Sequence, residues 1–101
     1  MNINLIETTK GYPYITRANL SKQLGVSVGT VDNRAKEIEA EVDNGRYPDC
    51  SVIHDGGITL FNYLVFLDYL NNRQKLREPN LRKYVEPFQP RKIADSIGWY
   101  N

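Results

Sequence analysis

Asn33 and Lys36 are the side chains whose types and spacing best suit hydrogen bonding to DNA. In a helix they lie, together with Gly29, on the face opposite Val31, because successive residues turn by about 100°. Asparagine can pair with adenine through two hydrogen bonds, lysine can reach guanine or a phosphate, and glycine lets the backbone come close. This face therefore indicates contact with a DNA groove, and the alternative is an ordinary solvent-exposed helix face.

A helix-turn-helix spacing would position that face. Leu20 and Leu24 lie one turn apart on a first helix, and Gly25 can adopt the left-handed conformation that ends it. Val26 then fills the corner, and Ser27 is a suitable N-cap for the second helix. Along that second helix, apolar residues recur at a spacing that faces a core: Val31, Ala35, Ile38 and Val42. The agreement of these constraints favours DNA binding over a purely structural two-helix corner.

Charge is segregated along the sequence. Thirteen Lys and Arg residues and 12 Asp and Glu residues give a net charge of +1, which argues against a strongly basic DNA-binding face. Residues 17–36, however, hold four cations against one acid, whereas the far end of the second helix is acidic. Residues 73–92 hold seven cations against two acids, so they either contact phosphate or form a solvated helix end and tail.

A short β-hairpin is expected after the second helix. Two β-prone runs, 51–54 and 58–60, are joined by Asp55-Gly56-Gly57, a turn rich in residues that accept positive φ. A hairpin in this place is typical of a wing, and Arg46 and His54 are its candidate contact residues. The alternative for His54 is a surface strand residue without a role. The carboxylate of Asp55 at the turn is unfavourable next to a phosphate.

A third helix is expected from Phe61 to Leu76, and it is apolar around much of its circumference. Some of these apolar side chains lie on parts of the helix surface that a single core does not need: Tyr63, Phe66 and Tyr69. This helix therefore requires a second packing partner. That partner is either the chain's own tail or another subunit, and we favour the tail. The apolar and aromatic residues of the tail include Phe88, Ile97, Trp99 and Tyr100.

The chain offers few residues for catalysis or metal binding. Cys50 and His54 are its only cysteine and histidine, which disfavours an internal disulfide, a zinc site and a nucleophilic triad. Glu37 and Glu41 lie four residues apart, as on any charged helix face. The chain starts without the basic and apolar run of a signal peptide, and no stretch approaches 18 apolar residues. We therefore expect a cytoplasmic protein that is not an enzyme, with no catalytic residue, metal or cofactor.

Several short motifs follow one another in a recognisable order: Tyr14-Ile15-Thr16, Leu24-Gly25-Val26-Ser27, Thr30-Val31 and Gly45-Arg46-Tyr47-Pro48. With the hairpin and the helix after it, residues 14–70 resemble winged helix-turn-helix proteins of the MerR and phage excisionase type. The second helix is longer than that family usually shows, and Asp55 occupies a wing position where a basic residue is expected. The resemblance implies a small architectural or regulatory DNA binder of a phage, prophage or mobile element. It places Ser27, Val28, Thr30, Asn33 and Arg34 at the groove-facing start of the recognition helix.

Together these patterns predict an α+β fold, a small winged helix-turn-helix domain that is mainly helical with a short β-hairpin wing. We assign residues 1–78 to the DNA-binding domain and 79–101 to a C-terminal tail that packs on the third helix or on a partner. The expected function is specific binding of double-stranded DNA, as an excisionase-like recombination directionality factor or a small transcription regulator. The alternative is a protein-interaction module that docks on a recombinase or a second copy through Phe66, Tyr69 and the tail, with no membrane contact. The candidate DNA-binding residues are Arg17, Ser27, Val28, Gly29, Thr30, Asn33, Arg34, Lys36, Arg46 and His54.

Overall fold

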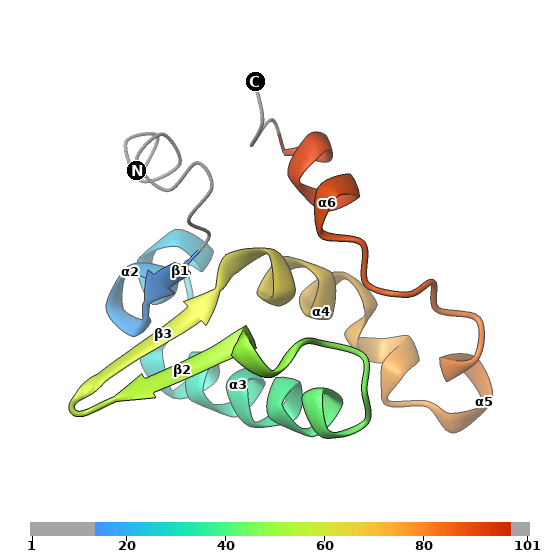
Figure 1. Cartoon of the computed structure of the whole chain (residues 1–101), viewed down its shortest axis with the longest axis horizontal. Helices are drawn as coiled ribbons and strands as arrows, with labels where there is room; N and C mark the ends of the chain where they lie inside the picture. The colour runs from blue at the N-terminus through green and yellow to red at the C-terminus, as the bar shows by residue number, and fades with distance from the viewer. Residues whose placement is uncertain (1–13, 98–101) are drawn as a thin grey trace.

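The computed structural model describes residues 14–97 of the 101-residue chain, so Trp99 and Tyr100 lie outside the described residues. Helices and a small antiparallel sheet alternate along the chain, which confirms the expected α+β class with a β-hairpin (Figure 1). The elements in chain order are β1 (Tyr14–Thr16), α2 (Arg17–Leu24), α3 (Val28–Asp43), η1 (Asp49–Ser51), β2 (Val52–Asp55), β3 (Ile58–Asn62), α4 (Tyr63–Leu76), α5 (Pro79–Arg82) and α6 (Pro90–Ser96). No helix within residues 14–97 is both long and apolar enough to cross a membrane.

The helix-turn-helix corner is present where the sequence predicts it. Gly25 ends α2 with a φ of 70°, and its amide donates to the Ser21 carbonyl at 3.0 Å. Ser27 caps α3, because its hydroxyl oxygen accepts from the Thr30 amide at 3.1 Å. Behind the corner, Leu20 of α2 is fully buried. The start of α3 is therefore fixed by a backbone turn and a side-chain cap.

The sheet has the order β1-β3-β2, and both strand pairs are antiparallel. The hairpin expected as a wing is formed by β2 and β3, and Gly56 adopts a φ of 62° at its tip. The expectation that the third helix begins at Phe61 is wrong, since that residue pairs with Ile15 of β1 and Val52 of β2. The helix instead begins at Tyr63, because the Asn62 side chain accepts hydrogen bonds from the first free amides of α4.

The core lies between α3, α4 and the inner face of the sheet. Phe61 and Phe66 meet there edge to face, with ring centroids 5.1 Å apart. Phe66 and Tyr69 are only 1% and 2% exposed, so the prediction that their arc is surplus is wrong. Phe61 of the sheet packs on Phe66, and the Tyr69 hydroxyl reaches Glu37 of α3. These two side chains are consequently unavailable for docking another protein.

The C-terminal segment packs back on α4 of the same chain. Ala94 of α6 is fully buried against Leu64, and Phe88 joins this contact from the segment that precedes α6. The Phe88 ring also packs edge to face on Tyr47, with the centroids 5.2 Å apart. Figure 1 shows α6 crossing the side of α4 that faces away from α3. The described part of the tail thus completes the second side of α4.

Candidate nucleic-acid interface

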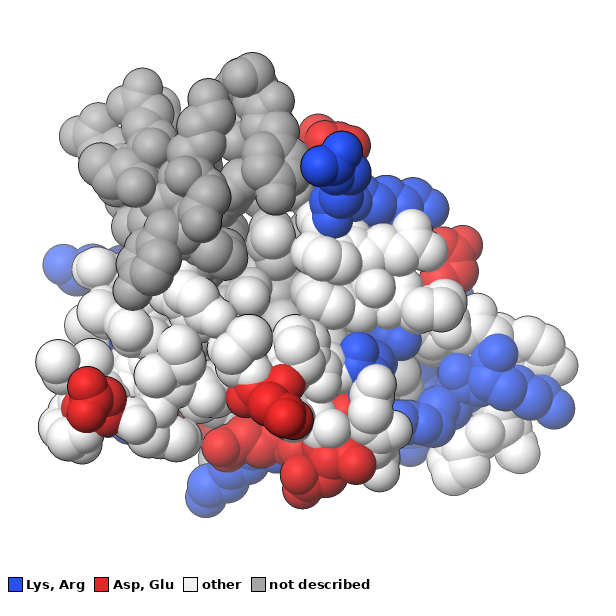
Figure 2. Space-filling model, viewed as in Figure 1, with Lys and Arg blue, Asp and Glu red and all other residues white. Residues whose placement is uncertain are grey.

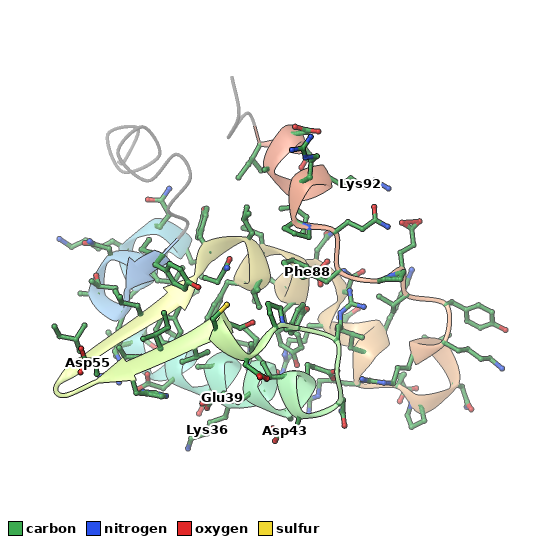
Figure 3. All side chains as sticks on the ribbon, viewed as in Figure 1. Lys36, Glu39, Asp43, Asp55, Phe88 and Lys92 are labelled. Carbon is green, nitrogen blue, oxygen red and sulfur yellow. The ribbon has the colours of Figure 1, made fainter. Side chains whose placement is uncertain are left out.

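One side of α3 is turned to solvent over its first three turns. Gly29, Asn33 and Lys36 are exposed there, whereas Val31 on the opposite side is 1% exposed, and Val28 is exposed at the start of the helix. We call these four exposed residues the α3 ridge. In Figure 3, Lys36 points away from the body of the molecule, on the side of α3 remote from α4 and α6. The sequence-predicted face is therefore assembled and accessible.

The start of the α3 ridge is polar, open and partly positive in character. The Ser27 hydroxyl lies 3.0 Å from the Thr30 hydroxyl, so both side chains serve the cap of α3. The neighbouring amides of the first turn carry the positive end of the helix dipole. Val28 is 40% exposed beside them and offers an apolar surface. This end of α3 combines features that suit a phosphate and a thymine methyl group.

Four acidic residues of α3 are each matched by a basic side chain from a neighbouring element. The pairs are Asp32 with Arg17 of α2 (3.0 Å), Glu37 with Arg73 of α4 (2.8 Å), Glu39 with His54 of β2 (3.4 Å) and Glu41 with Arg82 of α5. The histidine pair is ionic only when the ring is protonated. Among the described residues, Asp43 is the acid of α3 without an ion pair. The acidic second half of the helix is therefore largely compensated from its flanks.

The charged side chains separate on the surface as well. On the face shown in Figure 2, acidic side chains gather where α3 and β2 lie, and basic side chains gather at the end that carries α5. In Figure 3, Glu39 and Asp43 project on the same side as Lys36, further along α3. A polyanion is thus accommodated by the first half of α3 better than by its second half.

Arg34 does not belong to the α3 ridge, which corrects its assignment to the groove-facing start of the recognition helix. Its guanidinium donates to the Glu37 carboxylate at 3.2 Å, on the flank of α3 that faces α4, and its side chain is 25% exposed. The same carboxylate accepts from Arg73 at 2.8 Å and from the Tyr69 hydroxyl at 2.6 Å. Against the opposing effect of burial, the hydrogen bonds from Arg73 and Tyr69 lower the pKa of Glu37 to about 2. Arg34 is consequently part of the α3–α4 contact.

Arg46 also lies away from the interface, in the interior. Its side chain is 9% exposed, and its guanidinium donates to Asp68 of α4 and to the Glu86 carbonyl, each at 2.8 Å. Tyr47 donates to the same Asp68 oxygen at 2.6 Å. The assignment of Arg46 to DNA contact is therefore corrected to a structural role, because it joins the loop after α3, α4 and the tail. The one sequence signal for this pair is the acid at position 68 within the apolar run 64–70.

The hairpin is a poor surface for phosphates. His54 is well exposed, but its ring nitrogens lie 3.4 Å from Glu39 and from the Thr59 hydroxyl. No Lys or Arg occurs between positions 52 and 62, and Asp55 projects near the tip (Figure 3). Ile58 at the tip is 58% exposed. His54 is thus the one basic side chain that the wing itself could offer.

Arg17 completes the set of candidate residues. It is the first residue of α2, its side chain is 47% exposed, and it contacts α3 through Asp32. The structure therefore gathers Arg17, Ser27, Thr30 and the α3 ridge around the start of α3, and it leaves Arg34 and Arg46 elsewhere. Within residues 14–97, no group of three or more His, Cys, Asp or Glu side chains is placed to hold a metal ion. Comparisons with protein-family models, curated proteins and solved structures give no match for this chain.

Proposed function

We propose that the protein binds double-stranded DNA in a sequence-specific manner through the first three turns of α3. The observation that carries this proposal is the joint exposure of Asn33 and Lys36 on a helix whose start is fixed by a helix-turn-helix corner. An exposed helix of this kind fits the major groove, which is wide enough to admit it.

In this proposal the α3 ridge reads the bases. Asn33 pairs with an adenine, Lys36 reaches a guanine or a phosphate, and Val28 packs on a thymine methyl group. Gly29 lets the helix backbone lie close to the groove wall. Arg17 and the first-turn amides of α3 hold phosphates, which sets the register of the helix without reading sequence. The acids further along α3 lie where the helix leaves the groove.

The biological role follows from the sequence resemblance. We propose that the protein acts in the cytoplasm as an excisionase-like recombination directionality factor or as a small transcription regulator. Both roles require a small protein that recognises a defined duplex site. The alternative role as a protein-interaction module is weakened, because Phe66 and Tyr69 belong to the core.

Selection from a pool of random duplexes, followed by sequencing, tests the proposal. We expect enrichment of a short motif that contains an adenine, and loss of that enrichment when both Asn33 and Lys36 are replaced by alanine. A matched control replaces Asn71 and Lys75, which lie on α4 and are also exposed. Failure of the wild-type protein to enrich any sequence would favour the protein-interaction module.

A further inference from the structure

Asp32 occupies an unusual position among the acids of α3. It lies between the buried Val31 and the exposed Asn33, and its side chain is 41% exposed. Its carboxylate contacts Nε of Arg17 at 3.0 Å, across the helix-turn-helix corner. Asp32 therefore directly adjoins the α3 ridge, next to Asn33.

The partners of the other acids set Asp32 apart. Glu37 and Glu41 pair with side chains of α4 and α5, and Glu39 pairs with the wing. Asp32 pairs with Arg17, which is itself a candidate phosphate contact. Lys36 lies one helical turn beyond Asp32, on the same side of α3, since residues four apart are neighbours on a helix. One carboxylate therefore sits between two cations of the candidate interface.

This placement has an electrostatic consequence. A phosphate that approaches Arg17 or Lys36 also meets the negative charge of Asp32, and the phosphate competes with that carboxylate for the Arg17 guanidinium. The side chains of both partners are close to half exposed, at 47% for Arg17 and 41% for Asp32, so a phosphate in solvent can reach this pair. The net charge of Arg17, Asp32 and Lys36 together is +1, and neutralising the acid would double it.

We propose that Asp32 restrains the affinity of the protein for DNA by neutralising part of its phosphate-binding surface. The proposal rests on the proposed function, and it assigns Asp32 a role that none of the candidate DNA-binding residues has. Phosphate attraction is independent of sequence, so the restraint acts on every duplex. Asp32 thereby keeps binding dependent on the base contacts of the α3 ridge.

The test replaces Asp32 by asparagine. The amide keeps the shape of the side chain and an oxygen that can accept from Arg17, but it removes the charge. We expect Asp32→Asn to bind both a specific and an unrelated duplex about three- to tenfold more tightly at low salt. Glu39→Gln is the matched control, because it removes the same charge from the same helix at a site paired with His54. We expect the change in the logarithm of the DNA affinity caused by Glu39→Gln to be less than half of the change caused by Asp32→Asn.

A second pair of variants tests the route through Arg17. Arg17→Gln should weaken binding and lower the steepness of the salt dependence by about one counterion. In that background the gain from Asp32→Asn should shrink, because the competition for Arg17 is gone. Thermal unfolding of each variant checks that the exposed pair can be altered without loss of the fold.

The outcomes separate the two claims. If the wild-type protein binds DNA but Asp32→Asn gains no more than Glu39→Gln, the inference about Asp32 is wrong and the proposed function stands. If neither the wild type nor Asp32→Asn binds any duplex at low salt, both the proposed function and the inference about Asp32 are wrong. If Asp32→Asn raises the DNA affinity equally with Arg17 present and in the Arg17→Gln background, then Asp32 does not compete with phosphate for Arg17, and the inference is wrong.

Discussion

The most quantitative prediction concerns Glu37, on the side of α3 that faces α4. This carboxylate accepts hydrogen bonds from Tyr69 and Arg73 of α4 and from Arg34 of its own helix. Glu37→Gln keeps the size of the side chain but removes the charge that these donors share. We expect the variant to fold and to lose stability at neutral pH.

The size of the loss follows from the pKa of Glu37, which falls from 4.5 to about 2 in the folded protein. A fall of that extent corresponds to at most about 3 kcal/mol of stability once the group is ionised. The side chain is 27% exposed, so solvent screening reduces the expected loss to about 1–2 kcal/mol. Glu39→Gln, which breaks an exposed pair with His54, should cost less than about 0.5 kcal/mol.

The pH dependence provides the decisive assay. Because the pKa of Glu37 is lowered on folding, its contribution is present above pH 4.5 and is lost as the pH falls toward 2. Urea unfolding at pH 7, 4.5 and 2.5 should show that wild type and Glu37→Gln converge in stability as the pH falls. Glu39→Gln should stay parallel to the wild type. A constant difference in stability between wild type and Glu37→Gln across this range would show that folding does not lower the pKa of Glu37.

Three further predictions concern the elements that hold the site. Asp68→Asn should destabilise the protein by about 3–5 kcal/mol in denaturant unfolding, because it leaves Arg46 buried without its counter-charge; a loss below about 1 kcal/mol would contradict the structural role of that pair. Ser27→Ala should cost about 0.5–2 kcal/mol through loss of the α3 cap and should also weaken DNA binding, whereas unchanged stability would place the helix start elsewhere. Phe88→Ala should lower the melting temperature, at a cost of about 1–3 kcal/mol, because its half-buried ring packs on Tyr47; an unchanged melting temperature would show that the tail contributes little to the fold.

Local features of this fold are predictable from the sequence. The turn at Gly25, the cap at Ser27 and the hairpin at Gly56 each depend on a few consecutive residues, and the structure has all three. The exposed position of Asn33 and Lys36 follows from helical periodicity once the helix start is known.

Contacts between distant segments are not predictable in the same way. The sequence predicts that Arg46 and Arg34 are exposed cations. In the structure Arg46 forms an ion pair with Asp68 of α4, and Arg34 forms one with Glu37 of α3. The partner of Arg34 is three residues away on the same helix, but the contact of that pair with Arg73 of α4 is 36 residues distant. Nothing near Arg46 in the sequence identifies Asp68 as its partner. Phe66 was expected to be surplus, but it packs on Phe61 of β3, and the position of β3 depends on a strand pairing with β1 across more than 40 residues.

The most direct test of DNA recognition compares Asn33→Ala with Lys36→Ala on one selected duplex and its single-base mismatches. We expect Asn33→Ala to lose about 1–3 kcal/mol of binding free energy on the best site and to lose its preference at one base pair. Lys36→Ala should instead weaken binding to all the duplexes by similar factors if it holds a phosphate. If Asn33→Ala keeps the full preference of the wild type at every position, the α3 ridge does not read the DNA, and recognition through this helix face is wrong.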